Sequence, residues 1–462
     1  MASLSSLPLE IVLIIGTISD GQATFNLSYT CRRLYSVVHP LAFKTVSISR
    51  DNIWKLSCLS HLFAQDPSCA QAIRELKFVE TRAPLTLNKV QYDPAVIRPL
   101  LVGANDDELA THEGNLKAGQ SYWPWLAILL PLVTNLEDLY LAIDDLQPYE
   151  RELLHQTTSP KATPVLPRLD KAWISHWNEK CSLSSAAVIP FLRLPALSKL
   201  SGRLFRDSRD DDDSPSSEIE PFNVTDLWYS SYSVRGCSDL IDACKQLKQF
   251  SYKHDTTFRP DLPIFEPRGL YRSLRRHRES LEDVSIARKD TFPEARLPYM
   301  EPSFIGSFKD FPRIKRLDLS ARHLINWDDL AEPWSLADVL PPSVEVVSII
   351  DSVHCQDPGW LHRQMLEMHR EAVADDGGRY PKLHRCFLPG PLTIPSMEIM
   401  FAGHEILQVA RGKCNSLGPK AAAFLQKLLS PADNPGADNH DADNFDADNL
   451  DADNLDAMDE DP

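Results

Sequence analysis

The residues best suited to hold a metal ion lie between positions 354 and 370, in the segment HCQDPGWLHRQMLEMHR. His354, Cys355, His362 and His369 carry the imidazole and thiolate groups that zinc prefers as ligands. The second half of the segment has helical periodicity, which places His362 and His369 on one face, about 10 Å apart along the axis. That distance is too long for one ion, so we predict no metal site.

The common sequence patterns of enzyme active sites are absent from the chain. It contains no G-x-x-x-x-G-K-[ST] phosphate loop, no G-x-G-x-x-G dinucleotide pattern, no G-x-S-x-G nucleophile elbow and no H-E-x-x-H zinc site. With 17 glycines in 462 residues, further loops that could cradle a phosphate are not expected. We therefore predict that the protein is not an enzyme and binds no cofactor.

The composition predicts an intracellular protein with a large core. Apolar residues make up 43% of the chain, which is ample for a core. The nine cysteines are scattered and form no C-x-x-C pair, so neither a disulfide framework nor a zinc ribbon is expected. No apolar run approaches the ~18 residues that a membrane span needs. We expect no membrane partner and a cytoplasmic or nuclear location.

The net charge of −17 is concentrated at one end of the chain. Residues 432–462 contain eleven Asp, one Glu and no Lys or Arg, so the preceding residues carry a charge of only −5. A nearly balanced body does not indicate nucleic-acid binding. The C-terminal segment repeats a five-residue unit, DADN followed by one variable residue. This pattern predicts a disordered acidic tail over residues 430–462. A second acidic segment, residues 206–221, is predicted to be a mobile surface loop.

The elements that would position any site come from a six-residue pattern that recurs along the chain. It has an apolar residue, two polar residues, an apolar residue, a variable residue and an apolar residue. The intervals are mostly near 30 residues, and one interval of 63 residues leaves room for a copy that the pattern does not reveal. The clearest copies are LEDLYL at 136, LEDVSI at 281, IKRLDL at 314 and VEVVSI at 344. Looser copies are FKTVSI at 43, IRELKF at 73, LDKAWI at 169, LSKLSG at 197, VTDLWY at 224, LKQFSY at 247 and LHRCFL at 383.

Each copy predicts a short strand, because its last apolar residues alternate as one buried face requires. Segments with helical periodicity lie between the copies. One strand and one helix in ~30 residues cannot bury their own apolar faces, so such units must stack on one another. The predicted fold is therefore α/β, a solenoid over residues 49–429 with strands on its concave face and helices on its convex face.

The hexamers resemble those of the leucine-rich repeat family. That family usually places Asn or Cys three positions after the last apolar residue, where the side chain caps the backbone ladder. The clearest copies have Asp144, Lys289, Arg322 and Ser352 there instead. The resemblance therefore implies long, irregular repeats of this family.

Two short helical patterns precede the solenoid, between residues 4 and 48. Pro8 suits the first turn of a helix, where its missing N–H costs nothing. We expect three small helices here, with a core too small to be stable alone. They therefore need a partner or a neighbouring domain. The first pattern carries Ile11, Ile14, Ile15 and Ile18, and the second carries Leu27, Cys31, Leu34 and Val38.

Residues 4–48 resemble an F-box, with the L-P-x-E start at residues 7–10 and the HPLAF ending at residues 39–43. The family often has Trp at two places where this chain has Leu34 and Phe43. The residues that match the family's pattern, and that the resemblance implies as adaptor-binding, are Leu7, Pro8, Glu10, Ile11, Ile14, Leu27, Cys31, Leu34 and Phe43.

An F-box followed by leucine-rich repeats implies a substrate-recognition subunit of a ubiquitin ligase. In that family the F-box docks on a Skp-type adaptor, and through it on a cullin–RING ligase, while the repeats hold a protein substrate. The subunit performs no chemistry. The alternative is a ubiquitin-independent leucine-rich repeat scaffold, in which the apolar stripe of the first helix packs on the first repeat.

The predicted substrate-binding surface is the strand face of the solenoid. It is lined by the variable residue of each hexamer and by residues just after it, and aromatic side chains are favoured anchors at such surfaces. The candidates are Tyr140, Trp228, Tyr229, Tyr232, Tyr252, Ser285, Asp318 and Ser348.

Overall fold

A computed structural model gives the fold of the chain, which divides into a unit of residues 1–411 and a unit of residues 412–462. The predicted acidic tail, most of the predicted acidic loop and all four candidate metal ligands lie outside the described residues. The structure describes residues 4, 7–49, 53–79, 90–101, 106–119, 122–143, 166–176, 183–184, 188–206, 221–231, 235–255, 266–289, 304–324, 335–349, 364, 367–368, 370, 379–388, 396–402 and 405–411.

The N-terminal residues form the three predicted short helices. Pro8 stands at the N-cap of the first helix, and the Asp20 side chain caps the second by accepting a hydrogen bond from the Ala23 N–H at 2.7 Å. The helices enclose a small core of Val12, Leu34 and Val38. Their bounds are α1 Leu9–Ile18, α2 Gly21–Ser28 and α3 Arg32–Val38, followed by the short helix η2 Pro40–Phe43.

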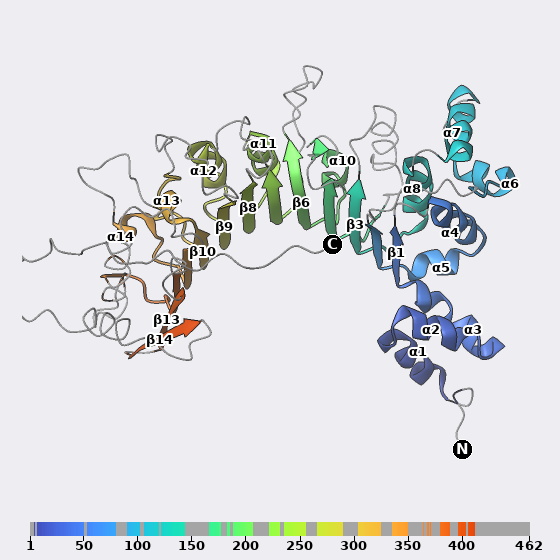
Figure 1. The fold of residues 1–462 in the computed structure, drawn as a ribbon, viewed down its shortest axis with the longest axis horizontal. Coiled ribbons are helices and arrows are strands. Elements are labelled where there is room, and N and C mark those ends of the chain that lie inside the picture. Colours follow the sequence, from blue (N-terminus) through green and yellow to red (C-terminus); the bar gives the residue numbers. More distant parts are fainter. Residues whose placement is uncertain are drawn as a thin grey trace, which may run out of the picture. The chain divides into compact units, whose positions relative to one another are not determined.

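A long parallel sheet of eleven strands follows, and each of the eleven hexamers forms one of these strands (Figure 1). The order along the sheet is β1-β2-β3-β4-β6-β7-β8-β9-β10-β11-β12, and the two-residue strand β5 pairs with β6. An antiparallel hairpin, β13–β14, extends the sheet beyond β12. The bounds are β1 Thr45–Ser49, β2 Glu75–Val79, β3 Asp138–Ile143, β4 Lys171–His176, β5 Leu183–Ser184, β6 Lys199–Arg206, β7 Asp226–Ser231, β8 Gln249–Asp255, β9 Asp283–Lys289, β10 Arg316–Leu319, β11 Val346–Ile349, β12 Arg385–Leu388, β13 Ser396–Ala402 and β14 Glu405–Arg411.

The 63-residue interval between two hexamers does not hide a further copy. β2 pairs directly with β3, with Glu75 opposite Asp138, so no strand is inserted between them. The described residues of this interval are helical or irregular. The longer spacing is therefore an insertion at one repeat, and helices make up most of its described residues.

Helices connect the strands and supply the other half of the core. In Figure 1 the helices α8, α10, α11 and α12 follow one another along the row of strands. The strand residues Leu139, Phe250 and Leu317 belong to one buried apolar cluster with the helix residues Leu240 and Leu274. The bounds are α4 Ile53–Gln65, α5 Pro67–Ala72, α6 Pro94–Ile97, η4 Arg98–Leu100, α7 Asp106–Ala118, α8 Trp123–Leu129, η5 Leu130–Leu132, α10 Ile189–Leu192, α11 Arg235–Ala243, α12 Pro267–Arg275, α13 Ala321–Leu324 and α14 Leu336–Val339.

One hydrogen-bond pattern joins every neighbouring pair of repeats from β1 to β12. The carbonyl oxygen just before each strand accepts hydrogen bonds from two successive N–H groups of the next repeat, at 2.7–3.3 Å. The Lys248 carbonyl, for example, accepts from Glu282 and Asp283 at 2.8 and 3.1 Å. This shared carbonyl fixes the register of each strand on its neighbour. Among the described helices, none is long and apolar enough to cross a membrane.

Candidate protein-interaction surfaces

Helix α1 is apolar on two sides, and only one of them is buried. Val12 and Gly16 are buried, whereas Ile11, Ile14 and Ile18 are exposed by 42%, 54% and 78%. On an α-helix these three positions lie roughly opposite Val12 and Gly16. A helix that is apolar all round is normally covered on all sides. The exposed side of α1 is therefore a candidate surface for a partner.

The buried side of α1 is held tightly against α3 and η2. A Cβ atom at Gly16 would lie 2.9 Å from Leu41 Cδ1 and 3.4 Å from Val38 Cγ1, so glycine permits the close approach. The Thr24 hydroxyl donates to the Gly16 carbonyl oxygen at 3.1 Å and fixes α2 to α1. The orientation of α1 is thus set by its own small core, which leaves the isoleucines outside.

Exposed large hydrophobic side chains are concentrated in this N-terminal segment. Nine of the ten among the described residues lie between residues 4 and 35, and the tenth is Trp228. Patches of exposed apolar side chains mark interaction sites or aggregation hazards. We call the five on α1 the α1 apolar surface: Leu9, Ile11, Leu13, Ile14 and Ile18.

Packing of the α1 stripe on the first repeat was one of the two alternatives, and the exposure of Ile11, Ile14 and Ile18 argues against it. The helical segment joins the repeats through η2 and the preceding residue His39 instead. The Phe43 ring lies 5.8 Å from the Phe63 ring of α4, and the Cys69 thiol lies 3.8 Å from His39 Nδ1. This joint leaves Ile11 uncovered.

The residues predicted to bind an adaptor divide into two groups. Pro8, Glu10, Ile11 and Ile14 are exposed. Leu34 is buried in the small core, so the prediction that it faces a partner is wrong. The small core also holds Leu7, Leu27 and Cys31 as half-buried residues, and Phe43 is half-buried at the joint with the repeats.

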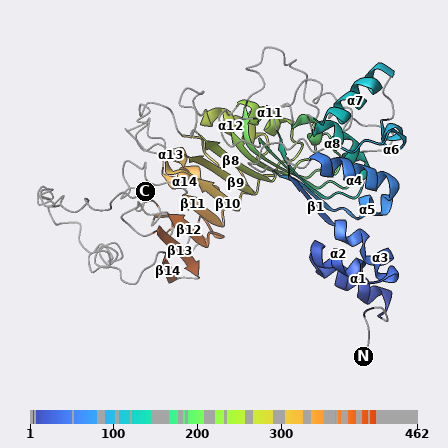
Figure 2. The ribbon, with the colours of Figure 1, turned by 45° about the vertical axis from the view of Figure 1, so that its right-hand side comes forward.

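The second candidate surface is the side of the parallel sheet that faces away from the helices, which we call the strand face. In β3, Leu139 and Leu141 are buried, whereas Asp138 before them and Tyr140 between them are partly exposed. The same alternation recurs from strand to strand, as one buried face requires. The fan of strands that carries this face is seen in Figure 2.

Five predicted substrate-binding residues lie in one row across the strand face. The pairing of the strands puts these hexamer positions in register. The row also contains Trp173, which the prediction missed although it occupies the variable position of LDKAWI. From β3 to β11 the row reads Tyr140, Trp173, Ser201, Trp228, Ser251, Ser285, Asp318 and Ser348.

Tyr229 and Tyr252 do not belong to this surface, and their prediction as binding residues is wrong. Each follows the variable position by one residue, so the alternation turns its side chain toward the helices. Both are almost fully buried, and burial raises the pKa of Tyr252 well above its usual value. Tyr232 lies outside the described residues.

The charges on the first strands of the strand face are matched in pairs. Lys77 Nζ lies 2.7 Å from Glu75 Oε1 and 5.3 Å from the Tyr140 ring centroid. Their hydrogen bond lowers the pKa of Glu75 and raises the pKa of Lys77. Lys171 Nζ lies 3.1 Å from Asp138 Oδ1. This part of the face therefore offers aromatic rings among neutralised charges.

The far end of the row carries an acidic side chain that is nearly buried. Asp318 is 8% exposed and accepts a hydrogen bond from Arg316 Nε at 2.9 Å. Burial raises the pKa of Asp318, and the Arg316 guanidinium opposes that rise. Burial also raises the pKa of Asp283, which pairs with Arg316 in the sheet register. The charge of Arg316 opposes the rise in pKa at both carboxylates.

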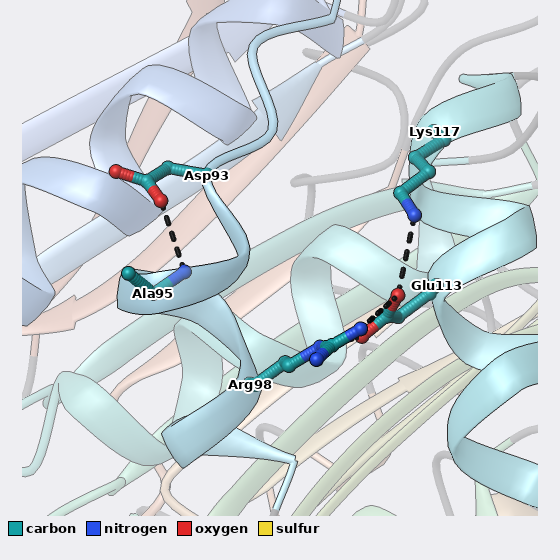
Figure 3. A network of polar contacts seen from close by, with 5 residues as sticks. All are labelled: Asp93, Ala95, Arg98, Glu113 and Lys117. Atoms are coloured by element: carbon teal, nitrogen blue, oxygen red, sulfur yellow. Dashed lines mark hydrogen bonds and ion pairs between the residues drawn. The ribbon is translucent and has the colours of Figure 1, made fainter.

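A separate polar network supports the helical insertion between β2 and β3 (Figure 3). Arg98 and Lys117 both donate to the Glu113 carboxylate, Lys117 at 3.2 Å, and they lower the pKa of Glu113 to about 2. The Asp93 side chain caps α6 by accepting from the Ala95 N–H at 2.9 Å. The Arg98–Glu113 contact joins η4 to α7, and the other contacts lie within one helix, so we assign the network a structural role. Among the described residues, no group of three or more His, Cys, Asp or Glu is arranged to hold a metal ion.

The parallel ladder, with one strand in each repeat, defines a repeat protein of mixed α/β class. A family model described as a leucine-rich repeat domain matches residues 148–357, so this part of the chain is similar to that family. No curated protein matches the chain. Domains of this family commonly bind other proteins, in agreement with a partner on one of the two surfaces.

Proposed function

We propose that the protein is a non-catalytic substrate-recognition subunit of a Skp–cullin–F-box ubiquitin ligase, acting in the cytoplasm or nucleus. Residues 4–48 would dock on the Skp-type adaptor as an F-box, and the leucine-rich repeats would hold a protein substrate. The observation that carries the proposal is the α1 apolar surface, which leaves Ile11, Ile14 and Ile18 exposed on a helix whose other side is already packed.

Docking of α1 in an apolar groove of the adaptor accounts for these side chains. An amphipathic helix binds a groove through anchors spaced by three, four and seven residues, which is the spacing of Ile11, Ile14 and Ile18. Full burial of one isoleucine contributes about 1.5–3 kcal/mol. Cover by a partner also removes the aggregation hazard that an exposed patch creates.

The repeats support the second half of the proposal by their fold alone. Holding a substrate beside the ligase raises the effective concentration of its lysines near the charged ubiquitin carrier. Such a role needs a binding surface and no catalytic residue. The strand face offers that surface, with Tyr140, Trp173 and Trp228 as aromatic anchors.

Co-expression of the full chain with a Skp-type adaptor tests the proposal. The wild-type chain should co-purify with the adaptor, and Ile11→Asp with Ile14→Asp should abolish co-purification. A matched control introduces the same two charges on α2 through Gln22→Asp and Ala23→Asp, both exposed, and should retain the adaptor. Adaptor binding that survives the isoleucine changes, or a wild-type chain that never binds, would refute the F-box assignment.

The alternative is a leucine-rich repeat scaffold that works without ubiquitin. It shares the strand face and the matching family model, but it needs no adaptor. A wild-type chain that purifies alone as a stable monomer and ignores the adaptor would favour this alternative. Size-exclusion chromatography with light scattering makes the distinction.

A further inference from the structure

Trp228 is the most exposed aromatic side chain among the described residues of the strand face, at 38%. Its neighbours in the row are Ser201 on β6 and Ser251 on β8, and both serines are half-buried. Side chains on a strand stand roughly perpendicular to the sheet, so the indole rises above a short side chain on each flank. Trp173 on β4 lies beyond Ser201 in the same row. Both sides of the Trp228 indole are therefore accessible to a partner.

The distance between the two serines matches one turn of a polyproline II helix. Ser201 and Ser251 lie two strands apart, which is about 9.6 Å. A polyproline II helix has three residues in each turn and rises 3.1 Å per residue, so residues i and i+3 lie about 9.3 Å apart on one side. Two prolines with P-x-x-P spacing would therefore lie above the two serines, one on each side of Trp228.

The rings of the strand face follow one another across the strands. Along β7 itself, the outward neighbours of Trp228 are Asp226 and Ser230, so a chain parallel to this strand would meet one ring. Across the strands, the row adds Trp173 and Tyr140, whose ring centroids lie 6.4 Å apart. The rings therefore favour an occupant that runs along the row.

The charges beside this part of the row cancel in pairs. From β2 to β8, every charged side chain in the row, or at the outward position before it, belongs to an ion pair of 2.7–3.2 Å. The pairs are Lys77 with Glu75, Lys171 with Asp138, and Lys199 with Asp226. On the other side of the row, Arg203 already interacts within the chain, and Lys253 and Asp255 of β8 have opposite charges. Because partner charges match across an interface, an uncharged segment fits best.

We propose that the row from Tyr140 to Ser251 binds an uncharged, proline-rich segment of a protein partner in polyproline II conformation. Prolines with P-x-x-P spacing pack above Ser201 and Ser251, on the two sides of Trp228. Such a segment is already ordered before it binds, and surfaces lined with aromatic rings recognise it. The inference rests on the proposed function, because it names the substrate class that the repeats would hold.

A random dodecapeptide library displayed on phage, selected on the full chain, tests the chemistry directly. The selected peptides should be enriched in P-x-x-P and should carry little net charge. Selection of peptides without proline, selection of strongly acidic or basic peptides, or no enrichment at all would overturn the proposal.

Two properties of the best selected peptide test the geometry and the charge argument by fluorescence anisotropy. A copy in which one proline is moved by one residue should bind about tenfold more weakly, because it no longer matches the two-strand spacing. The affinity of the original peptide should change by less than about twofold as salt is raised from about 0.05 M to about 0.5 M. Equal binding of the shifted peptide, or a steep fall with salt, would contradict the proposal.

Two variants and a matched control locate the binding site. Trp228→Ala removes the central ring, and Ser251→Leu fills the space above one serine; each should weaken peptide binding by about tenfold or more. Ser348→Leu makes the same change in the same row, three strands beyond Ser251, and should leave binding unchanged. Equal weakening by Ser348→Leu, or no weakening by either of the other variants, would refute the assigned site.

Failure of this inference can be told apart from failure of the proposed function. The Trp228 and Ser251 variants should still co-purify with the adaptor, and circular dichroism should show their fold intact. The α1 double variant should lose the adaptor and still bind the selected peptide. A chain that binds the peptide but never the adaptor would keep this inference and refute the ligase role.

Discussion

The helical segment and the repeat sheet place their apolar side chains in opposite ways. The sheet turns alternate residues inward, so Leu139 and Leu141 meet the helices while Tyr140 between them meets solvent. Helix α1 buries Val12 but leaves Ile11 and Ile14 outside. The sheet thus buries its apolar positions, whereas α1 has an apolar side with no cover among the described residues of the helical segment.

This difference in the placement of apolar side chains separates residues that stabilise the fold from residues that are free to contact a partner. Within the sheet, the apolar positions serve folding, and the variable position between them faces away from the helices. In α1, apolar residues are buried on one side of the helix and exposed on the other. The consequence is that a substitution of the same type should affect folding in one region and partner binding in the other.

The largest expected effect on the free energy of unfolding comes from a substitution in the buried core of the sheet. Phe250→Ala removes a fully buried ring from β8 and should reduce the free energy of unfolding by about 3–5 kcal/mol. Ile14→Ser, at a half-exposed position of α1, should change it by no more than about 0.5 kcal/mol. Thermal unfolding followed by circular dichroism compares the two. Comparable losses would show that α1 is covered in the free protein.

A smaller effect is expected where α1 meets α3. Gly16→Leu forces a side chain against Leu41 and Val38 and should destabilise the helical segment by about 1–3 kcal/mol. Gly114→Leu in α7 is the matched control, because a Cβ there meets nothing within 4 Å and leucine favours a helix by up to about 1 kcal/mol over glycine. Hydrogen exchange of the α1–α3 amides is the measurement. Unchanged protection in the Gly16 variant would contradict the tight packing.

The smallest effect concerns a buried histidine between two repeats. Burial lowers the pKa of His277, whose Nδ1 accepts from the Leu247 N–H while Nε2 donates to the Ile241 carbonyl oxygen at 2.8 Å. The His277 side chain binds a proton more readily in the unfolded chain than in the folded one. The stabilising contribution of neutral His277 is therefore present above about pH 6.5 and declines as the pH falls below that value.

Melting temperatures measured from about pH 7.5 down to about pH 5.5 test this sign. The wild-type chain should lose stability over that range, and His277→Gln should show a shallower dependence on pH. An identical pH dependence in both proteins would mean that another group is responsible.

The sequence predicted the sheet well because each hexamer combines a period of two with a fixed interval. All eleven hexamers became strands, including weak copies such as LSKLSG. The interval before β3 was misinterpreted because an inserted segment of helices and a missing repeat have the same length. The hairpin β13–β14 was not predicted, since it follows no hexamer and pairs antiparallel to β12.

For the candidate surfaces, the sequence predicted the orientation of some residues correctly and of others wrongly. The variable hexamer position correctly located Tyr140 and Trp228, because alternation alone decides which side of a sheet a residue faces. Tyr229 was misplaced when a local cluster of aromatic residues was given more weight than that alternation. Leu34 was misplaced because a family pattern does not say whether a matching residue binds a partner or forms the small core.

The shared carbonyl between neighbouring repeats has a consequence for how the chain responds to force. Each repeat from β2 to β12 is attached to the preceding one by the same pair of N–H groups on one oxygen. Pulling perpendicular to the strands would therefore load one junction at a time, and repeats would detach in sequence from an end. If this chain were pulled from its C-terminal end, it would unfold in small steps of similar size. Detached repeats could then refold one by one onto the remaining solenoid.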